Sequence, residues 1–125
     1  MKVLVDTHIF LWSVQDRARL KSAHIDILTS ANVELWVSVA SVWECKIKAD
    51  SGKLALIDAV ENLALDFAGD RILPVQLTHA AHMLADPPNT KDPFDRLLLS
   101  QCEAENMRLL TADKRLLTHR LALSA

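Results

Sequence analysis

Glycine is scarce in this sequence: Gly52 and Gly69 are the only two among its 125 residues. A phosphate-binding loop needs several glycines close together, so the sequence excludes a site of that kind. Half of the residues are hydrophobic, which argues against a disordered or low-complexity chain. A chain of this length can bury one core but not two, so we expect a single domain over residues 1–125.

Cysteine, long apolar runs and excess positive charge are lacking too. Cys45 and Cys102 form no metal-binding pair and lie in apolar segments, so we expect buried, reduced thiols in a cytoplasmic protein. No stretch approaches the ~20 apolar residues of a transmembrane helix, and the start does not look like a signal peptide. The net charge of −2 argues against tight nonspecific binding of nucleic acid. It still permits an enzyme that holds a short piece of nucleic acid through metal ions and a few arginines.

Short apolar strands alternate with helices along the chain. The pattern predicts strands over residues 2–6, 34–37, 71–75 and 108–111. It predicts helices over residues 8–14, 22–30, 38–50, 57–68, 78–84, 93–105 and 113–118. This alternation is typical of an α/β fold in which helices cover both faces of a parallel sheet. In such folds ligands bind beyond the carboxyl ends of the strands.

Local signals predict several helix ends. We expect Ser22, Ser38 and Thr78 to be the N-caps of the helices that they open. We expect Gly52 and Gly69 to end the two helices that precede them.

Four acidic residues occupy positions that exposure to solvent explains poorly. Asp6 ends the first strand and Asp113 follows the last, which places both at the carboxyl edge of the sheet. Asp95 lies in the first turn of a helix, and Glu44 lies inside a mostly apolar one. If the fold gathers these carboxylates, protons or a cation must relieve their repulsion. A divalent metal does so economically, which makes the chain a candidate metal-dependent hydrolase.

Three of these acids also have purely structural explanations. Asp6 and Asp113 can each cap the helix that follows. Glu44 precedes Lys48 by one helical turn, and such a pair contributes only ~0.2–0.5 kcal/mol on an exposed face. Glu44 nevertheless flanks the apolar stripe of its helix instead of opposing it, so both interpretations stay open.

The fourth acid shares its helical turn with another. Asp92 precedes Pro93, which suits the first position of a helix, and Asp95 follows two residues later. Asp92 fits the N-cap and Asp95 fits the third helical position, where an acid favours the helix dipole. Because capping needs only one acid, we assign Asp92 to the cap and Asp95 to the site.

Other candidate residues have weaker support. His79 and His82 are spaced as zinc ligands on a helix can be, but no further Cys or His completes a set. His8 is interpreted as a hydrogen-bonding neighbour of the first acid, and serine or cysteine nucleophile motifs are absent. Three tryptophans are expected in the core instead of stacking on bases: Trp12, Trp36 and Trp43.

Four segments, taken in order, resemble the motifs of one family. They are Val-Leu-Val-Asp-Thr-His at 3–8, Ser-Val-Ala-Ser-Val-Trp-Glu at 38–44, Asp-Pro-Phe-Asp-Arg-Leu-Leu at 92–98 and Leu-Leu-Thr-Ala-Asp at 109–113. The chain resembles PIN-domain ribonucleases over its whole length, and most closely the VapC toxins of bacterial toxin–antitoxin pairs. Two features depart from the family: Thr90 and Lys91 stand where a histidine is common, and the short tail makes a fifth strand doubtful.

The resemblance implies a three-layer fold with a sheet of four to five strands and a Mg²⁺- or Mn²⁺-dependent endoribonuclease. Carboxylates without Cys or His suit these hard ions. By resemblance, Asp6, Asp95 and Asp113 hold metal, and Glu44 acts as a ligand or orients the attacking water. The products expected are a 5′-phosphate and a 3′-hydroxyl. Residues expected to support the site or contact substrate phosphates are Thr7, Asp92 and Thr111, and Arg96, Lys114 and Arg115.

The expected partners are an RNA substrate, an antitoxin protein and a second copy of the chain. Three alternatives stay open. The chain can be a PIN-like housekeeping nuclease, a PIN-like binding module without activity, or a Mg²⁺-binding signalling module of the receiver type. The receiver reading requires a second acid beside Asp6 and an aspartate at the end of a central strand, and we identify neither in the sequence.

Overall fold

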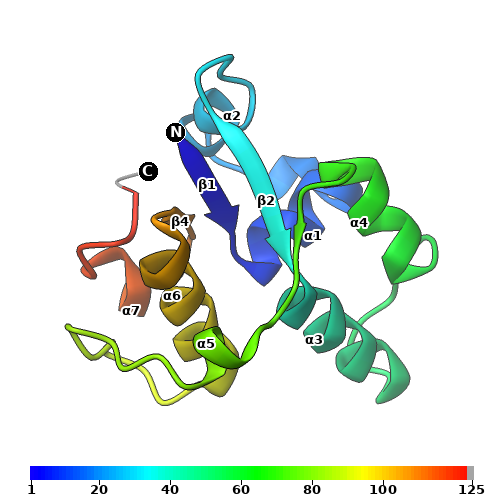
Figure 1. Cartoon of the computed structure of the whole chain (residues 1–125). Coiled ribbons are helices and arrows are strands. Elements are labelled where there is room, and N and C mark those ends of the chain that lie inside the picture. Colours follow the sequence, from blue (N-terminus) through cyan, green and yellow to red (C-terminus); the bar gives the residue numbers. More distant parts are fainter. Residues whose placement is uncertain (124–125) are drawn as a thin grey trace.

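The computed structural model describes residues 1–123, in which a four-stranded parallel sheet is flanked by helices (Figure 1). The strands are β1 (Lys2–Val5), β2 (Glu34–Ser38), β3 (Ile72–Leu73) and β4 (Arg108–Leu110), in the spatial order β3-β2-β1-β4. The helices are α1 (Thr7–Gln15), α2 (Ser22–Leu28), α3 (Val39–Asp50), α4 (Val60–Ala68), α5 (Leu77–Ala80), α6 (Pro93–Glu105) and α7 (Lys114–Leu117), with a 3₁₀ turn at Arg17–Arg19. The predicted α/β fold with a central parallel sheet is confirmed.

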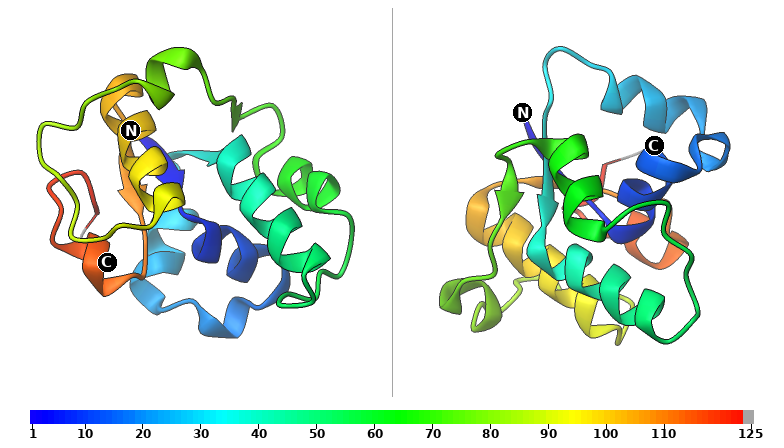
Figure 2. Two further views of the ribbon diagram at one scale, coloured as in Figure 1. Left: turned by 90° about the horizontal axis from the view of Figure 1, so that it is seen from below. Right: turned by 90° about the vertical axis from the view of Figure 1, so that its right-hand side faces the viewer.

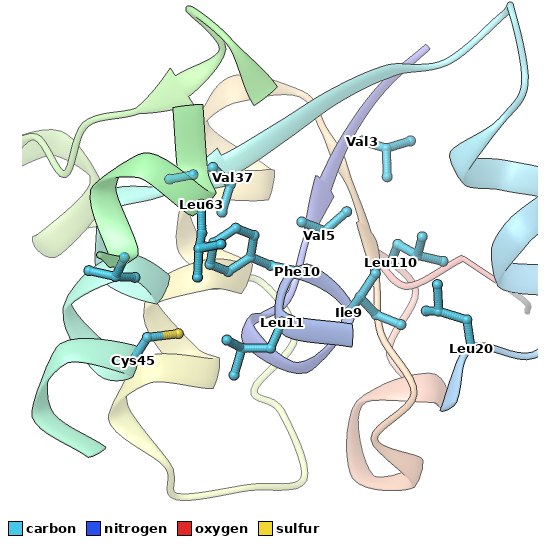
Figure 3. Packing of buried hydrophobic residues seen from close by; sticks show 12 residues of the cluster. Val3, Val5, Ile9, Phe10, Leu11, Leu20, Val37, Cys45, Leu63 and Leu110 are labelled. Atoms are coloured by element: carbon cyan, nitrogen blue, oxygen red, sulfur yellow. The ribbon is translucent and has the colours of Figure 1, made fainter. Parts of the chain in front are cut away.

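Alternate residues of β1 face opposite layers, as the period of a strand requires. Val3 and Val5 belong to one buried cluster, which includes Phe10 of α1 and Leu63 of α4 (Figure 3). Leu4, between them, belongs to a second cluster with residues of α6. Helix α3 contacts α1, α4 and α6, so it lies where the two helical layers meet (Figure 2). The sheet is therefore buried on both faces.

The strands end at a common edge. Val5 is paired with Val37 of β2 and with Leu110 of β4, so these three strands finish in register. Helices α1 and α3 begin immediately after β1 and β2, at the ends to which the strand arrows point in Figure 1. The residues that follow the strands, Asp6 and Thr111, are brought side by side by this topology.

The outer strands are shorter than predicted. The strand expected over 71–75 pairs only at Ile72 and Leu73, because the next residue is Pro74, which has no N–H to donate. On the other side of the sheet, Leu109 forms an isolated parallel bridge with Ala122. Within residues 1–123 the tail therefore adds one bridge beside β4.

Two predicted N-caps are wrong for the same reason. The caps of α2 and α5 are Lys21 and Gln76, each one or two residues before the predicted Ser22 and Thr78. In both helices a histidine three residues after the cap accepts a hydrogen bond from the cap's backbone N–H, at 3.1 Å. These residues, His24 and His79, are buried. This hydrogen bond uses a backbone N–H group that has no partner within the helix. The usual preference for serine or threonine at an N-cap therefore does not predict a cap of this kind.

Other helix ends follow the sequence more closely. Ser38 caps α3 through its hydroxyl, as predicted. The amides of Gly52 and Lys53 bond back to the carbonyls of Ala49 and Lys48, which is the Schellman arrangement, with Gly52 at φ +77°. Gly69 ends α4 at φ +62°. The predicted helix over 57–68 begins only at Val60, and the one over 78–84 shortens to Leu77–Ala80.

The apolar stripe of α3 faces solvent, contrary to expectation. Val39, Trp43 and Ile47 are 42%, 62% and 42% exposed, whereas Glu44 is buried. Trp43 is thus not a core residue, and Trp12 and Trp36 are half-buried. These three residues thus form an exposed apolar stripe along α3.

The expectation that both cysteines are buried agrees with the structure. Cys45 and Cys102 are both buried and unpaired, and burial raises the pKa of each thiol. Among residues 1–123, no helix is both long enough and apolar enough to cross a membrane.

Candidate active site

Asp6 is buried at the end of β1, where it joins two elements. Its Oδ1 accepts a hydrogen bond from the backbone N–H of Ile9 at 2.8 Å, so Asp6 caps α1. Its Oδ2 accepts a hydrogen bond from the hydroxyl of Thr111, the residue after β4. Burial raises the pKa of the Asp6 carboxyl, although both hydrogen bonds favour the charged form. The capping and site interpretations of Asp6 are therefore compatible.

Thr111 also contacts Asp113, the second acid that follows a strand. Its Oγ1 accepts a hydrogen bond from the backbone N–H of Asp113 at 3.0 Å. Asp113 caps α7 by accepting from the backbone N–H of Arg115, and the Arg115 guanidinium lies 2.8 Å from Asp113 Oδ2. This ion pair lowers the pKa of Asp113. One threonine thus positions Asp6 and Asp113 together.

Asp92 and Asp95 divide the first turn of α6 as the sequence suggests. Asp92 Oδ1 accepts from the backbone N–H groups of Phe94 and Asp95, at 2.8 and 3.2 Å, so Asp92 is the N-cap. The Asp95 carboxylate is only 18% exposed and lies 3.8 Å from the Arg115 guanidinium. Burial, followed by the charges of nearby acids, raises the pKa of Asp95 to about 6.

Glu44 is held by donors from two helices. Its Oε1 accepts a hydrogen bond from the hydroxyl of Thr7 at 2.6 Å, and Thr7 Oγ1 also lies 3.1 Å from Ser41 Oγ. The Lys48 ammonium is 2.8 Å from Glu44 Oε2. The predicted Glu44–Lys48 pair is present, but on a buried face of α3 instead of an exposed one, and the hydrogen bond to Glu44 raises the pKa of Lys48.

The structure brings the four acids to one edge of the sheet. The pKa of Asp95 is raised by the charges of Asp113, Asp6 and Glu44, as well as by Asp92. Their side chains are not arranged as a ready-made coordination shell: within residues 1–123 no three His, Cys, Asp or Glu side chains converge at ligand spacing. Two cations of the protein lie among them instead, Lys48 on Glu44 and Arg115 between Asp113 and Asp95.

The donor set nevertheless fits a hard divalent cation. Asp6, Asp95 and Asp113 offer carboxylate oxygens, and their side-chain partners within residues 1–123 are the Thr111 hydroxyl and the Arg115 guanidinium, with no thiol or imidazole hydrogen-bonded to them. Oxygen ligands of this kind suit Mg²⁺ or Mn²⁺. Burial is the main cause of the raised pKa of both Asp6 and Asp95, and the charges of neighbouring acids add to it.

The three candidate phosphate contacts have different environments. Arg96 and Lys114 are exposed. Arg96 lines a cavity of about 810 Å³ between α5, the following loop and α6, together with Lys91. Arg115 is paired with Asp113 and reaches towards Asp95, so in this structure it neutralises the site.

Ser41 and the site role of Lys48 were missed from the sequence. Ser38, Ser41 and Glu44 recur every three residues, which puts them near one face of α3. That spacing was a usable signal for Ser41. Nothing local could show that Lys48 would face the acids, because the apolar residues of α3 suggested that the opposite face was buried.

The other candidates are explained structurally. His79 Nε2 lies 2.9 Å from a carboxylate oxygen of Glu105, and His82 Nε2 lies 2.8 Å from one of Glu103. These two histidines join α5 and its following loop to α6. The His8 and Trp12 rings lie side by side at a tilt of 40°, with centroids 5.7 Å apart, and the charge of His8 makes a minor contribution that lowers the pKa of Asp6 and Asp113.

Comparison with known proteins assigns the family and the fold. The sequence profile of the PIN domain matches residues 3–120. No curated protein sequence matches significantly. A toxin–antitoxin complex from Klebsiella pneumoniae contains a similar chain, with a TM-score of 0.66 and 15% identity, covering 98% of this chain and 96% of that one.

Two further solved structures are similar. VapBC2 from Rickettsia felis, bound to a DNA fragment from its promoter, has a TM-score of 0.59 and 14% identity over 93% of this chain and 96% of that one. FitAcB from Neisseria gonorrhoeae has a TM-score of 0.53 and 17% identity over 89% and 87%. At these identities the structural likeness establishes a shared fold.

Proposed function

We propose, from the premise that this chain belongs to the PIN domain family, that it is a metal-dependent endoribonuclease and the toxin of a toxin–antitoxin pair. The observation that carries the proposal is the meeting of Asp6, Glu44, Asp95 and Asp113 at the carboxyl edge of the sheet. One of the similar structures is a toxin–antitoxin complex, which supports the biological setting. We propose that the protein acts in the cytoplasm, where it would meet RNA. We propose further that residues 1–125 act as one domain.

In this proposal the residues of the chain have distinct roles. Asp6, Asp95 and Asp113 would hold Mg²⁺ or Mn²⁺, which supplies a water of lowered pKa and neutralises charge on the phosphate. Thr111 fixes the direction of the Asp6 carboxylate, and Thr7 fixes that of Glu44. Glu44 accepts a hydrogen bond from the attacking water or orients it.

Substrate contacts come from the flanks of the acids. Arg96 and Lys114 are exposed and next in sequence to Asp95 and Asp113, so each can reach a phosphate beside the cleaved bond. With a net charge of −2 overall, such local cations have to supply the attraction for RNA.

Removal of metal tests the function directly. We expect RNA cleavage in the presence of Mn²⁺ or Mg²⁺ and none in excess EDTA, because the proposed mechanism needs a cation to lower the pKa of the attacking water. The measurement is cleavage of a labelled RNA, resolved by gel, with end-group analysis for a 5′-phosphate. An Asp95→Asn preparation purified in parallel controls for contaminating ribonucleases. Cleavage by the wild type that persists in EDTA and is absent from the control would rule the mechanism out.

The antitoxin is proposed to use a groove beside the first helices. A cavity of about 530 Å³ lies between α1, α2 and α4, with Val14, Leu28, Leu63 and Phe67 among its walls. Trp12 of α1 is not among them; its ring lies at a tilt beside that of His8. A partner anchored in this groove could extend a lysine or arginine to the acids, where it would take the place of the metal's charge.

A second copy of the chain is proposed to cover the outward apolar face of α3 and α6. Trp43 packs against Phe94 edge-to-face, with centroids 6.0 Å apart. Around them lies a cavity of about 580 Å³ whose walls carry no charged residue: Val39, Ala40, Trp43, Val75, Pro93, Phe94 and Leu97. An uncharged face of this kind can pack on itself across a two-fold axis. A homodimer formed here would bring two sets of acids together, since Asp95 directly follows Phe94.

A single charge on this face is expected to produce monomers. Trp43→Glu would bury a carboxylate in the proposed contact, whereas Leu65→Glu changes an exposed leucine (54%) of α4 outside it. Analytical ultracentrifugation at micromolar concentration should show a dimer for the wild type and Leu65→Glu, and a monomer for Trp43→Glu. A wild-type protein that sediments as a monomer, or a dimeric Trp43→Glu variant, would contradict the proposed interface.

A further inference from the structure

Both carboxylate oxygens of Glu44 are bound by side chains of the protein itself. Oε1 accepts a hydrogen bond from the Thr7 hydroxyl at 2.6 Å, and the Lys48 ammonium lies 2.8 Å from Oε2. The Glu44 side chain is 10% exposed, against 39% for Lys48. This buried carboxylate therefore has a counter-charge from its own helix and a hydroxyl donor from α1.

The acids on the other side of the site are compensated differently. The Arg115 guanidinium lies 2.8 Å from Asp113 and 3.8 Å from Asp95, and its side chain is 57% exposed. Such a surface ion pair contributes little, and the arginine can turn into water with small loss. The cation on the side of Asp113 and Asp95 is therefore exchangeable.

Displacing Lys48 would be more costly, because the carboxylate that it neutralises is buried. A divalent ion on Glu44 would have to remove an ammonium from a buried carboxylate, and the displaced lysine would remain close to the incoming double charge. An ion on Asp6, Asp95 and Asp113 displaces only the exposed Arg115. The geometry thus favours a metal ion on Asp6, Asp95 and Asp113. Glu44 stays paired with Lys48.

We propose that Lys48 is a positioning residue that keeps Glu44 neutralised and hydrogen-bonded to Thr7, so that the site takes a single divalent ion on Asp6, Asp95 and Asp113. The inference rests on the proposed function, because it concerns the same acids. It assigns Glu44 to the reacting water instead of the metal. In this arrangement the Lys48 ammonium supplies the positive charge that a second metal ion bound to Glu44 would otherwise supply.

Titration of the RNA-free protein with Mn²⁺, followed by calorimetry, tests this assignment. The wild type should bind one ion. Lys48→Met, which keeps the aliphatic stem but not the charge, should bind two, because Glu44 then lacks its cation. Lys48→Arg should restore one. Arg115→Met removes the same charge from the opposite side, and should keep one ion but bind it about tenfold more tightly, the size of effect that a neighbouring charge has on a carboxylate.

The outcomes separate this inference from the function on which it rests. Two ions on the wild type, or one ion on a folded Lys48→Met variant, would overturn the role of Lys48. If circular dichroism shows that Lys48→Met does not fold, the number of Mn²⁺ ions bound by the wild type and by Lys48→Arg tests the role of Lys48. A wild type that cleaves RNA with two bound ions refutes only the role of Lys48. A wild type that binds one ion without cleaving RNA refutes the nuclease function and leaves the charge arrangement standing.

Discussion

Asp95→Asn is expected to abolish RNA cleavage and, at the same time, to stabilise the metal-free protein at pH 7. Asp95 has a pKa raised to about 6 by burial and by the neighbouring acids. Its charged form is therefore disfavoured in the folded state, and asparagine removes that charge while keeping the shape. After discounting for partial exposure, we expect a gain of about 1–2 kcal/mol in the free energy of unfolding. Thermal or urea unfolding in EDTA measures it, and the RNA assay measures the loss of activity.

The pH dependence of stability tests whether Asp95 is the source of this gain. The folded state binds the Asp95 proton more tightly than the unfolded state, whose pKa is near 3.8. As pH falls from 7 through about 6 towards 4, the wild type should therefore gain stability from this group. The asparagine variant lacks that gain, so its advantage over the wild type should shrink on acidification. An advantage that stays constant with pH would show that Asp95 is not the group responsible.

Asp92→Ala is the matched control in the same helical turn. Asp92 accepts from two backbone N–H groups, so its loss should cost ~1 kcal/mol of stability, the usual value of an N-cap. Substantial RNA cleavage should remain. If Asp92→Ala is inactive and stable while Asp95→Asn is active and unstable, the two roles have been exchanged.

Asp6→Ala is expected to convert a growth-inhibiting protein into a harmless one. Asp6 is a proposed metal ligand, and its loss removes cleavage whether or not the rest of the site survives. Expression of the wild type alone should slow growth, co-expression of the antitoxin should restore it, and Asp6→Ala should have no effect on growth. The variant should still co-purify with the antitoxin, because the groove between α1, α2 and α4 does not include Asp6.

Asp6→Asn separates loss of chemistry from loss of fold. Asparagine retains an oxygen that can accept from Ile9, so α1 stays capped, whereas alanine loses that hydrogen bond. Both variants should be harmless, and Asp6→Asn should melt at the higher temperature. Toxicity of soluble Asp6→Ala would disprove the toxin mechanism. Harmless variants that also fail to bind the antitoxin would indicate misfolding, which the melting curves would show.

Features governed by neighbouring residues were predicted well from the sequence. The caps at Ser38 and Asp92 and the left-handed glycines Gly52 and Gly69 depend on groups within one helical turn. The same is true of Asp6, because a strand that ends in an acid before a helix defines its own cap. The exceptions, the caps of α2 and α5, depend on histidines whose rings are held by burial.

The orientation of α3 could not be predicted in the same way. Its apolar residues occur on more than one face, and the buried face proved to be the one with Ser41, Glu44 and Cys45. Trp43, the largest side chain of the helix, faces outward. A helix surrounded by α1, α4 and α6 is rotated by the packing of all three, and no local pattern contains that information.

Parallel strands have their carboxyl ends together, so the sequence alone placed two of the proposed site acids, Asp6 and Asp113, at one edge of the sheet. How the charges of the four acids are compensated could be learned only from the folded chain. Thr7 and Glu44 are 37 residues apart, and Thr111 and Asp6 are 105 apart, yet each pair shares a buried hydrogen bond. Such contacts exist only after the sheet and both helical layers have packed. The same packing turns Lys48 towards the acids and leaves Trp43 in solvent, which no pattern along the chain specifies.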